Sequence, residues 1–177
     1  MDYVPCVVYD HEFGEFYDGE ASVDENSNFK KVELIINSKQ FSIKTYFHDQ
    51  KHVIFYVSKT EDKLYRKPPK FFDRAGFGYN KNKMDLETYL TLRYGLCTYR
   101  TGNVIVQPMY EYFNFFTKFK HKDYIQVKKN GMWGAISMKG EVVLDFNYHN
   151  TYSLEHRLEA FLNYKKNYRK KYGQVSM

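Results

Sequence analysis

The chain is poor in the residues that build disulfide frameworks, collagen-like repeats and membrane spans. Two cysteines, Cys6 and Cys97, are too few for a disulfide framework or a four-cysteine zinc site. Four prolines and ten glycines exclude collagen and proline-rich linkers. No stretch approaches the roughly 18 consecutive apolar residues of a membrane span, and the acidic N-terminus has no apolar signal region. We therefore expect a cytoplasmic protein that has no membrane partner.

Aromatic residues are abundant instead. Tyrosine, phenylalanine and tryptophan make up 19% of the 177 residues, a content that disordered polar chains lack. A chain of this length buries roughly 70% of the surface that its unfolded form exposes. The composition therefore predicts a globular protein with a substantial core.

Charge is distributed unevenly along the chain, although the net charge is only +6. Residues 1–28 contain eight acidic residues and no Lys or Arg, whereas the rest carries all 27 basic and 13 acidic residues. Such a separation can be neutralised within the chain or by a partner. Either the acidic segment lies against the basic body, or a basic surface stays free for an acidic ligand.

Alternation of apolar and polar residues predicts β-strands in the first part of the chain. The strands expected on this basis are residues 4–9, 31–37, 41–47 and 53–57. Short polar turns would connect the last three of them into an antiparallel meander.

Two adjacent prolines, Pro68 and Pro69, cannot donate hydrogen bonds to a sheet and mark the best candidate boundary. Residues 85–93 fit either a short helix or a strand, and the segment that follows slightly favours the strand. We expect the parts to pack as one compact domain. The expected parts are an N-terminal β-meander (1–69), a second β-rich part (70–151) and a basic C-terminal helix (152–177).

Two segments of the second part are similar to each other. Each begins with an aromatic–glycine pair, Tyr94–Gly95 and Trp133–Gly134, and continues through a turn into an aliphatic run. A glycine next to a large ring lets a neighbouring ring or backbone approach closely. Trp133 is expected to be a core anchor, because its indole buries a large apolar area.

The second copy predicts a unit of three strands. Asn130–Gly131 is the dipeptide favoured in two-residue hairpins, because both of its residues accept positive φ. Gly140 lies in the next turn. The expected strands are residues 124–129, 132–137 and 141–146.

The segment from Lys129 to Val143 resembles the bacterial WG-repeat family. Units of that family run as a basic residue, Asn-Gly, an aromatic–glycine pair, an aliphatic residue, a polar turn with glycine, and Val-Val or Val-Ile. The earlier copy is similar from Tyr94 onward but lacks the Asn-Gly hairpin, and a fainter similarity lies at Phe16–Val23. The second copy carries Phe146 where proline is usual.

The resemblance covers about residues 90–150. Together with the residue patterns along the chain, it predicts a mainly β (α+β) fold with antiparallel β-meanders, WG-type three-stranded repeat units and a C-terminal α-helix. The resemblance itself implies a β-rich repeat surface used for interactions, without a shared catalytic site. The Lys-, Asn-, Tyr- and Phe-rich composition is typical of an AT-rich bacterial or phage genome.

The sequence contains no motif that indicates catalysis, a cofactor or a metal site. His48 and His52 have the i, i+4 spacing of some zinc sites, but the expected tight turn would keep them off a common face. No phosphate-binding loop or nucleophile elbow is present. We therefore expect a non-enzymatic protein; a hydrolase would need a cleft that holds a His or Cys with a shifted pKa.

Residues 152–172 predict a helix that Ser153 caps and Gly173 ends. Its apolar stripe, expected to pack on the sheet, is Leu154, Leu158, Phe161 and Leu162. The candidate binding residues in its last turns are Tyr164, Lys165, Lys166, Tyr168, Arg169, Lys170 and Lys171. Basic residues among tyrosines can contact phosphates and stack on bases; alternatively, the tyrosines continue the packing face and the lysines face solvent. A second basic group, which would extend this surface, is Lys118, Lys120, Lys122, Lys128 and Lys129.

Two functions follow as hypotheses. The leading one is a protein-binding module, such as an inhibitor, immunity or accessory protein, that engages an unidentified protein partner through its β-repeat surface. The alternative is binding of RNA or single-stranded DNA through the basic, tyrosine-interleaved C-terminal helix.

Overall fold

The computed structural model forms two compact units, Met1–Tyr112 and Phe113–Met177. The expected boundary at Pro68–Pro69 lies outside the described residues, as do His48, residues 85–91 and Lys118 to Lys122. The residues that the structure describes are 2–10, 15–45, 47, 52–60, 63–64, 92–114 and 123–173.

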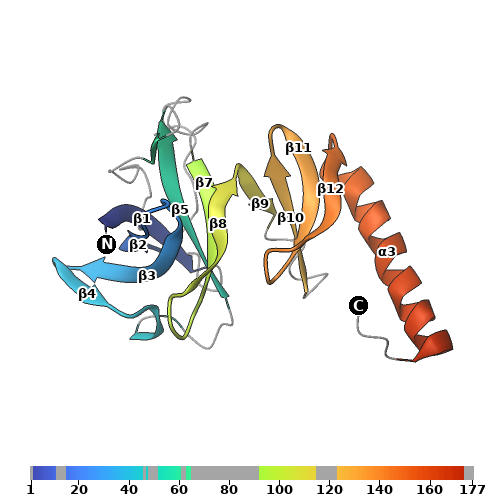
Figure 1. Ribbon diagram of the computed structural model, residues 1–177, viewed down its shortest axis with the longest axis horizontal. Coiled ribbons are helices and arrows are strands. Elements are labelled where there is room, and N and C mark those ends of the chain that lie inside the picture. Colours follow the sequence, from blue (N-terminus) through green and yellow to red (C-terminus); the bar gives the residue numbers. More distant parts are fainter. Residues whose placement is uncertain are drawn as a thin grey trace. The chain divides into compact units, whose positions relative to one another are not determined.

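The first unit is an antiparallel sheet whose strands follow the order β4-β3-β2-β1-β5-β7-β8, with β6 paired to β5 (Figure 1). The strands β1 to β4 form a meander, and β5 then pairs with β1 and β7. The strands of this sheet are β1 (Asp2–Asp10), β2 (Glu15–Val23), β3 (Phe29–Ile36), β4 (Lys39–Phe41), β5 (His52–Thr60), β6 (Lys63–Leu64), β7 (Leu92–Thr98) and β8 (Val104–Tyr110).

The strand expected over residues 41–47 is wrong. β4 ends at Phe41, and a 3-10 helix, η1 (Ile43–Thr45), follows. The Ser42 and Thr45 hydroxyls hydrogen-bond at 3.0 Å, and the Thr45 amide donates to the Ser42 carbonyl. This turn directs both Ile43 and Phe47 into the core. The expected meander is therefore wrong in its last step, because β5 pairs with β1 and not with the 41–47 segment.

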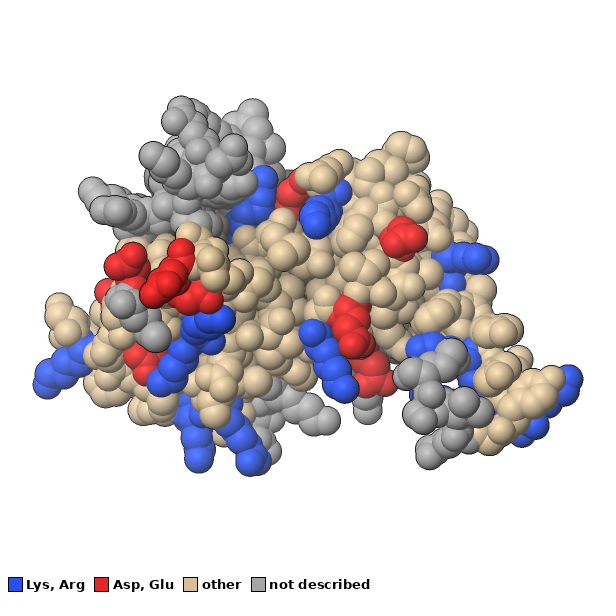
Figure 2. All heavy atoms as spheres, in the orientation of Figure 1, with Lys and Arg blue, Asp and Glu red and all other residues tan. Residues whose placement is uncertain are grey.

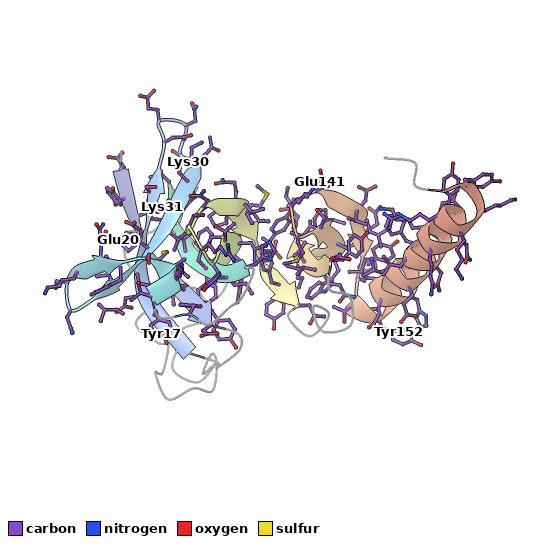
Figure 3. All side chains as sticks on the ribbon, turned by 90° about the horizontal axis from the view of Figure 1, so that it is seen from below. Tyr17, Glu20, Lys30, Lys31, Glu141 and Tyr152 are labelled. Atoms are coloured by element: carbon purple, nitrogen blue, oxygen red, sulfur yellow. The ribbon has the colours of Figure 1, made fainter. Side chains whose placement is uncertain are left out.

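The strand β2 was not expected, yet it lies in the middle of the sheet between β1 and β3. It carries part of the acidic segment, and Figure 3 shows Glu20 on β2 and Lys31 on the neighbouring strand β3. In the turn that follows, Asp24 pairs with the Lys30 ammonium at 2.8 Å and accepts hydrogen bonds from the Asn26 and Asn28 amides.

The end of this sheet formed by β7 and β8 is hydrogen-bonded to β3. The Val32 amide donates to the Gly102 carbonyl at 2.8 Å, in the turn between β7 and β8. The Gln107 side chain on β8 both donates to and accepts from the Phe29 backbone, at 2.9 and 2.8 Å. The sheet therefore curls around one apolar core, which includes Cys6, Val8, Ala21, Val32, Leu34, Phe55 and Cys97.

The second unit is a four-stranded antiparallel sheet in the order β12-β11-β10-β9, covered by the helix α3 (Figure 1). This confirms the strands expected for the second repeat copy and the C-terminal helix. Asn130 and Gly131 form the expected hairpin turn with φ of 50° and 77°. The elements are β9 (Tyr112–Asn114), β10 (Tyr124–Lys129), β11 (Met132–Ser137), β12 (Val142–Tyr148) and α3 (Thr151–Tyr172).

The first half of α3 holds the core of the second unit. Leu154 and Leu158 are fully buried against Ala135, and Phe161 and Leu162 are partly buried beside them, which confirms the expected stripe. The expected cap is wrong, because the helix begins after Asn150, whose side chain accepts from the Ser153 amide at 2.9 Å. Gly173 ends the helix as expected.

In its described part the protein is therefore mainly β, with two antiparallel sheets and a C-terminal helix. No helix among the described residues has the length and apolar character that crossing a membrane would need.

Candidate functional site

The second half of α3 is the part of the helix that leaves the core. None of residues 163–172, all of which the structure describes, is buried. Tyr164 and Tyr172 are 64% and 56% exposed. Tyr164 and Tyr172 therefore do not continue the packing face, whereas Tyr168 is half-buried. Figure 1 shows this half of α3 running past the end of the sheet.

Three tyrosines form a ladder along this half. They are spaced four residues apart, which places them above one another on one side of a helix. The ring centroids of Tyr164 and Tyr168 are 6.1 Å apart, and those of Tyr168 and Tyr172 are 4.8 Å apart. Tyr172 was not among the predicted binding residues, although its spacing from Tyr168 already indicates it.

Five cations surround the ladder: Lys165, Lys166, Arg169, Lys170 and Lys171. No carboxylate of the described residues forms an ion pair with them. The Lys165 ammonium lies 4.8 Å from the Phe161 ring centroid, and the Lys171 ammonium lies 5.1 Å from that of Tyr172. In Figure 2 this end of α3, at the lower right, is blue and tan. We call these five residues and the three tyrosines the basic–tyrosine surface.

The helix dipole accounts for only part of this charge. Cations in the last turn of a helix stabilise it because they face its negative end. Arg169, Lys170 and Lys171 lie in that turn. Lys165 and Lys166 lie before it, so the helix dipole does not account for their charge.

The second basic group does not extend this surface within the described residues. Lys128 and Lys129 pair with Trp133 and Met132 at the hairpin end of the sheet. The opposite end of β10 is where the Tyr124 ring contacts Phe161, 6.4 Å between centroids. The basic half of α3 follows Phe161, so it lies beyond that opposite end.

The two aromatic–glycine pairs occupy the same position in their sheets. Tyr94 pairs with Tyr110 and Leu96 with Val106, with an irregularity between them. In the second unit, Trp133 pairs with Tyr148 and Ala135 with Leu144, again with an irregularity between them. Both rings are half-buried: Tyr94 contacts the Tyr56 and Tyr112 rings, and Trp133 packs with the Leu154–Leu158 core.

The glycine of each pair lies against a backbone carbonyl. A Cβ on Gly95 would be 2.8 Å from the Val106 oxygen, and one on Gly134 would be 2.8 Å from the Leu144 oxygen. Gly19 on β2 has the same 2.8 Å approach to the Glu33 oxygen, and its neighbour Glu20 pairs with Glu33. The sheets therefore repeat one close contact that only glycine permits. In the turn after β11, Gly140 has a φ of 86° and donates to the Ser137 carbonyl.

Residues 100–133 match the family model of the WG containing repeat. The matched segment begins in the turn between β7 and β8 and ends at Trp133 of the second aromatic–glycine pair. The resemblance seen in the sequence is thereby confirmed for this segment. No curated protein and no solved structure matches the chain.

The described strands of the two sheets offer little reactive chemistry. In the ranges that the structure describes, no three His, Cys, Asp or Glu side chains gather in a way that could hold a metal ion. Cys6 and Cys97 are fully buried, and burial raises the pKa of both thiols. A protonated, inaccessible thiol is a poor nucleophile. The basic–tyrosine surface is therefore the candidate site.

Proposed function

We propose that the protein is a non-enzymatic binding protein that holds single-stranded RNA or DNA on the basic–tyrosine surface of α3. The observation that carries the proposal is the ladder of three tyrosines, of which Tyr164 and Tyr172 are exposed and Tyr168 is half-buried, among five cations without a described carboxylate partner. Tyrosine rings stack on bases of any sequence, at about 1–3 kcal/mol per base. The cations neutralise the phosphates and release their counterions.

The composition of the surface favours nucleic acid over protein as the ligand. Protein interfaces are enriched in tyrosine and arginine but depleted in lysine. Four of the five cations here are lysines, which bind phosphate as compact point charges. The basic character of the whole chain, with a pI near 9.1, also suits a polyanionic ligand.

The test is a fluorescence anisotropy titration with labelled single strands of about 12 nucleotides, a length within the site sizes of such proteins. We expect binding at about 50 mM salt, with log K falling by about 0.7 for each neutralised phosphate as log salt rises. Replacing the five cations of the surface with glutamine should abolish it. Replacing the three tyrosines with leucine should weaken it while leaving the salt dependence.

The chain offers a matched control of the same charge and composition. Four exposed lysines and one exposed arginine belong to strands and turns outside α3: Lys30, Lys39, Lys44, Arg100 and Lys139. Their replacement with glutamine should cause a far smaller loss than the change on α3. Absence of binding at about 50 mM salt, where basic proteins bind most strongly, or an equal loss in both variants would contradict the proposal.

A protein partner at the edge of the second sheet is the second candidate, and it keeps the inhibitor, immunity or accessory role. β12 is an edge strand of that sheet, and its Val142 is 52% exposed. An extended segment of a partner could add to such an edge through main-chain hydrogen bonds. This function would be favoured if the protein captures a stoichiometric protein partner, if Val142→Arg abolishes the capture, and if the five-glutamine variant still captures the partner.

A further inference from the structure

A cavity lies beside the tyrosine ladder, between α3 and β12. Its volume is about 280 Å³, and Leu144, Arg157, Ala160, Phe161 and Tyr164 line it. Arg157, Phe161 and Tyr164 are spaced by four and three residues, so they share one face of the helix. Ala160 adds only a methyl group to the lining. Because Tyr164 also begins the ladder, the cavity is continuous with the basic–tyrosine surface.

The size of the cavity suits one flat ring system. Pockets for small molecules occupy about 300–1,000 Å³, so a volume just below that range holds a single base and not a longer ligand. Phe161 and Tyr164 supply aromatic surface for stacking, and Leu144 and Ala160 supply aliphatic contacts. The Lys165 ammonium lies 4.8 Å from the centroid of the Phe161 ring, so it adds positive charge beside one of the lining residues.

Arg157 and Tyr164 supply the polar groups of the cavity lining. The Tyr164 hydroxyl can donate or accept a hydrogen bond, whereas the Arg157 side chain presents only donors. The guanidinium has five donors and no acceptor, and none of the lining residues is acidic. On the base edge that carries N7, guanine presents two adjacent acceptors, O6 and N7, whereas adenine presents an amino donor beside N7. The paired donors of a guanidinium therefore favour guanine over adenine, the other purine.

We infer that this cavity holds a guanine base, stacked on Phe161 and Tyr164, with the Arg157 guanidinium donating to O6 and N7. The inference rests on the proposed function, since it names the base that the same surface prefers. Its chemistry is that of a guanine nucleotide, which a strand or a free nucleotide could supply. The experiment therefore includes both ligands.

The first arm compares oligothymidylates of about 12 nucleotides that carry one central guanine, adenine or 7-deazaguanine, which lacks the N7 acceptor. We expect about tenfold tighter binding for guanine, since a good bidentate pair contributes about 1–3 kcal/mol of discrimination. Arg157→Lys keeps the charge but loses the paired donors, so it should remove the preference while retaining most of the affinity. Arg169→Lys is the matched control and should keep the preference.

The second arm titrates free guanosine and adenosine monophosphates and follows the backbone amides of α3 by NMR. Equal binding of all oligonucleotides, or a guanine preference that survives Arg157→Lys, would overturn the guanine inference and leave the proposed function standing. If no oligonucleotide binds, the proposed function fails. In that case, binding of free guanosine monophosphate that depends on Arg157 would support the cavity as a site for a free nucleotide. If free guanosine monophosphate does not bind either, the guanine inference is overturned as well.

Discussion

Replacing Gly134 with alanine tests the contact that the aromatic–glycine pairs share. The added Cβ would lie 2.8 Å from the Leu144 oxygen and 2.8 Å from Cδ1 of the Phe146 ring. The carbonyl belongs to the β11–β12 pairing and cannot move without disturbing it. Gly134 does not have a positive φ, so the cost comes from the contact alone. Overpacking of this kind costs about 1–3 kcal/mol.

The assay is urea unfolding followed by fluorescence and far-UV circular dichroism. Trp133 is the only tryptophan in the sequence and packs in the core of the second unit, so its emission reports on that unit. With a slope of about 1–3 kcal/mol per molar urea, the loss should lower the midpoint by about 1 M. Gly131→Asn is the control: no described atom lies within 4 Å of a Cβ there, and asparagine tolerates positive φ. An alanine variant at Gly134 as stable as the wild type would refute the reasoning.

Three further outcomes are expected from burial and charge. Leu158→Ala should lower the free energy of unfolding by about 2–5 kcal/mol because the side chain is fully buried, whereas Tyr164→Ala on the exposed half should change it by under about 0.5 kcal/mol; urea unfolding measures both. Hydrogen bonds from the Lys30 ammonium and the Asn28 amide lower the pKa of Asp24 to about 2, below its ordinary value of 3.8. The stability that Asp24 contributes is therefore present above about pH 4 and lost as the pH falls through 2, and an NMR titration of its carboxyl should show this low pKa. A thiol reagent should leave Cys6 and Cys97 unmodified in the folded protein and label both in urea, since burial raises their pKa values.

The strands of the second unit could be predicted because local signals agree there. Apolar alternation, the Asn130–Gly131 turn and the heptad-like stripe of α3 all specify the observed elements. The strand predicted for residues 41–47 was wrong because the same apolar spacing also fits a helical turn. The hydrogen bonds between Ser42 and Thr45 stabilise that turn. The apolar alternation that predicts strands is weak in β2. Its inward positions include the small residues Gly19 and Ala21, and the acidic residues Asp18 and Glu20 alternate with them.

The candidate site could be predicted in part. The five cations and two of the tyrosines are apparent from composition and helical spacing, as a basic run among aromatics. The exposure of these side chains could not be predicted from the sequence, because it depends on where the sheet beneath α3 ends. The cavity could not be predicted at all, since Leu144 comes from β12 and meets Arg157 and Phe161 only through tertiary packing.

Photo-crosslinking tests the central claim, that single strands lie along the tyrosine ladder, most directly. A strand carrying 5-bromouracil would be irradiated with the protein, and the modified tyrosines identified by mass spectrometry. Tyr152, in the first turn of α3 (Figure 3), is 72% exposed and so controls for simple accessibility. The account predicts crosslinks at Tyr164, Tyr168 and Tyr172 that salt suppresses. Crosslinks at Tyr152 or elsewhere without any on the ladder would contradict it.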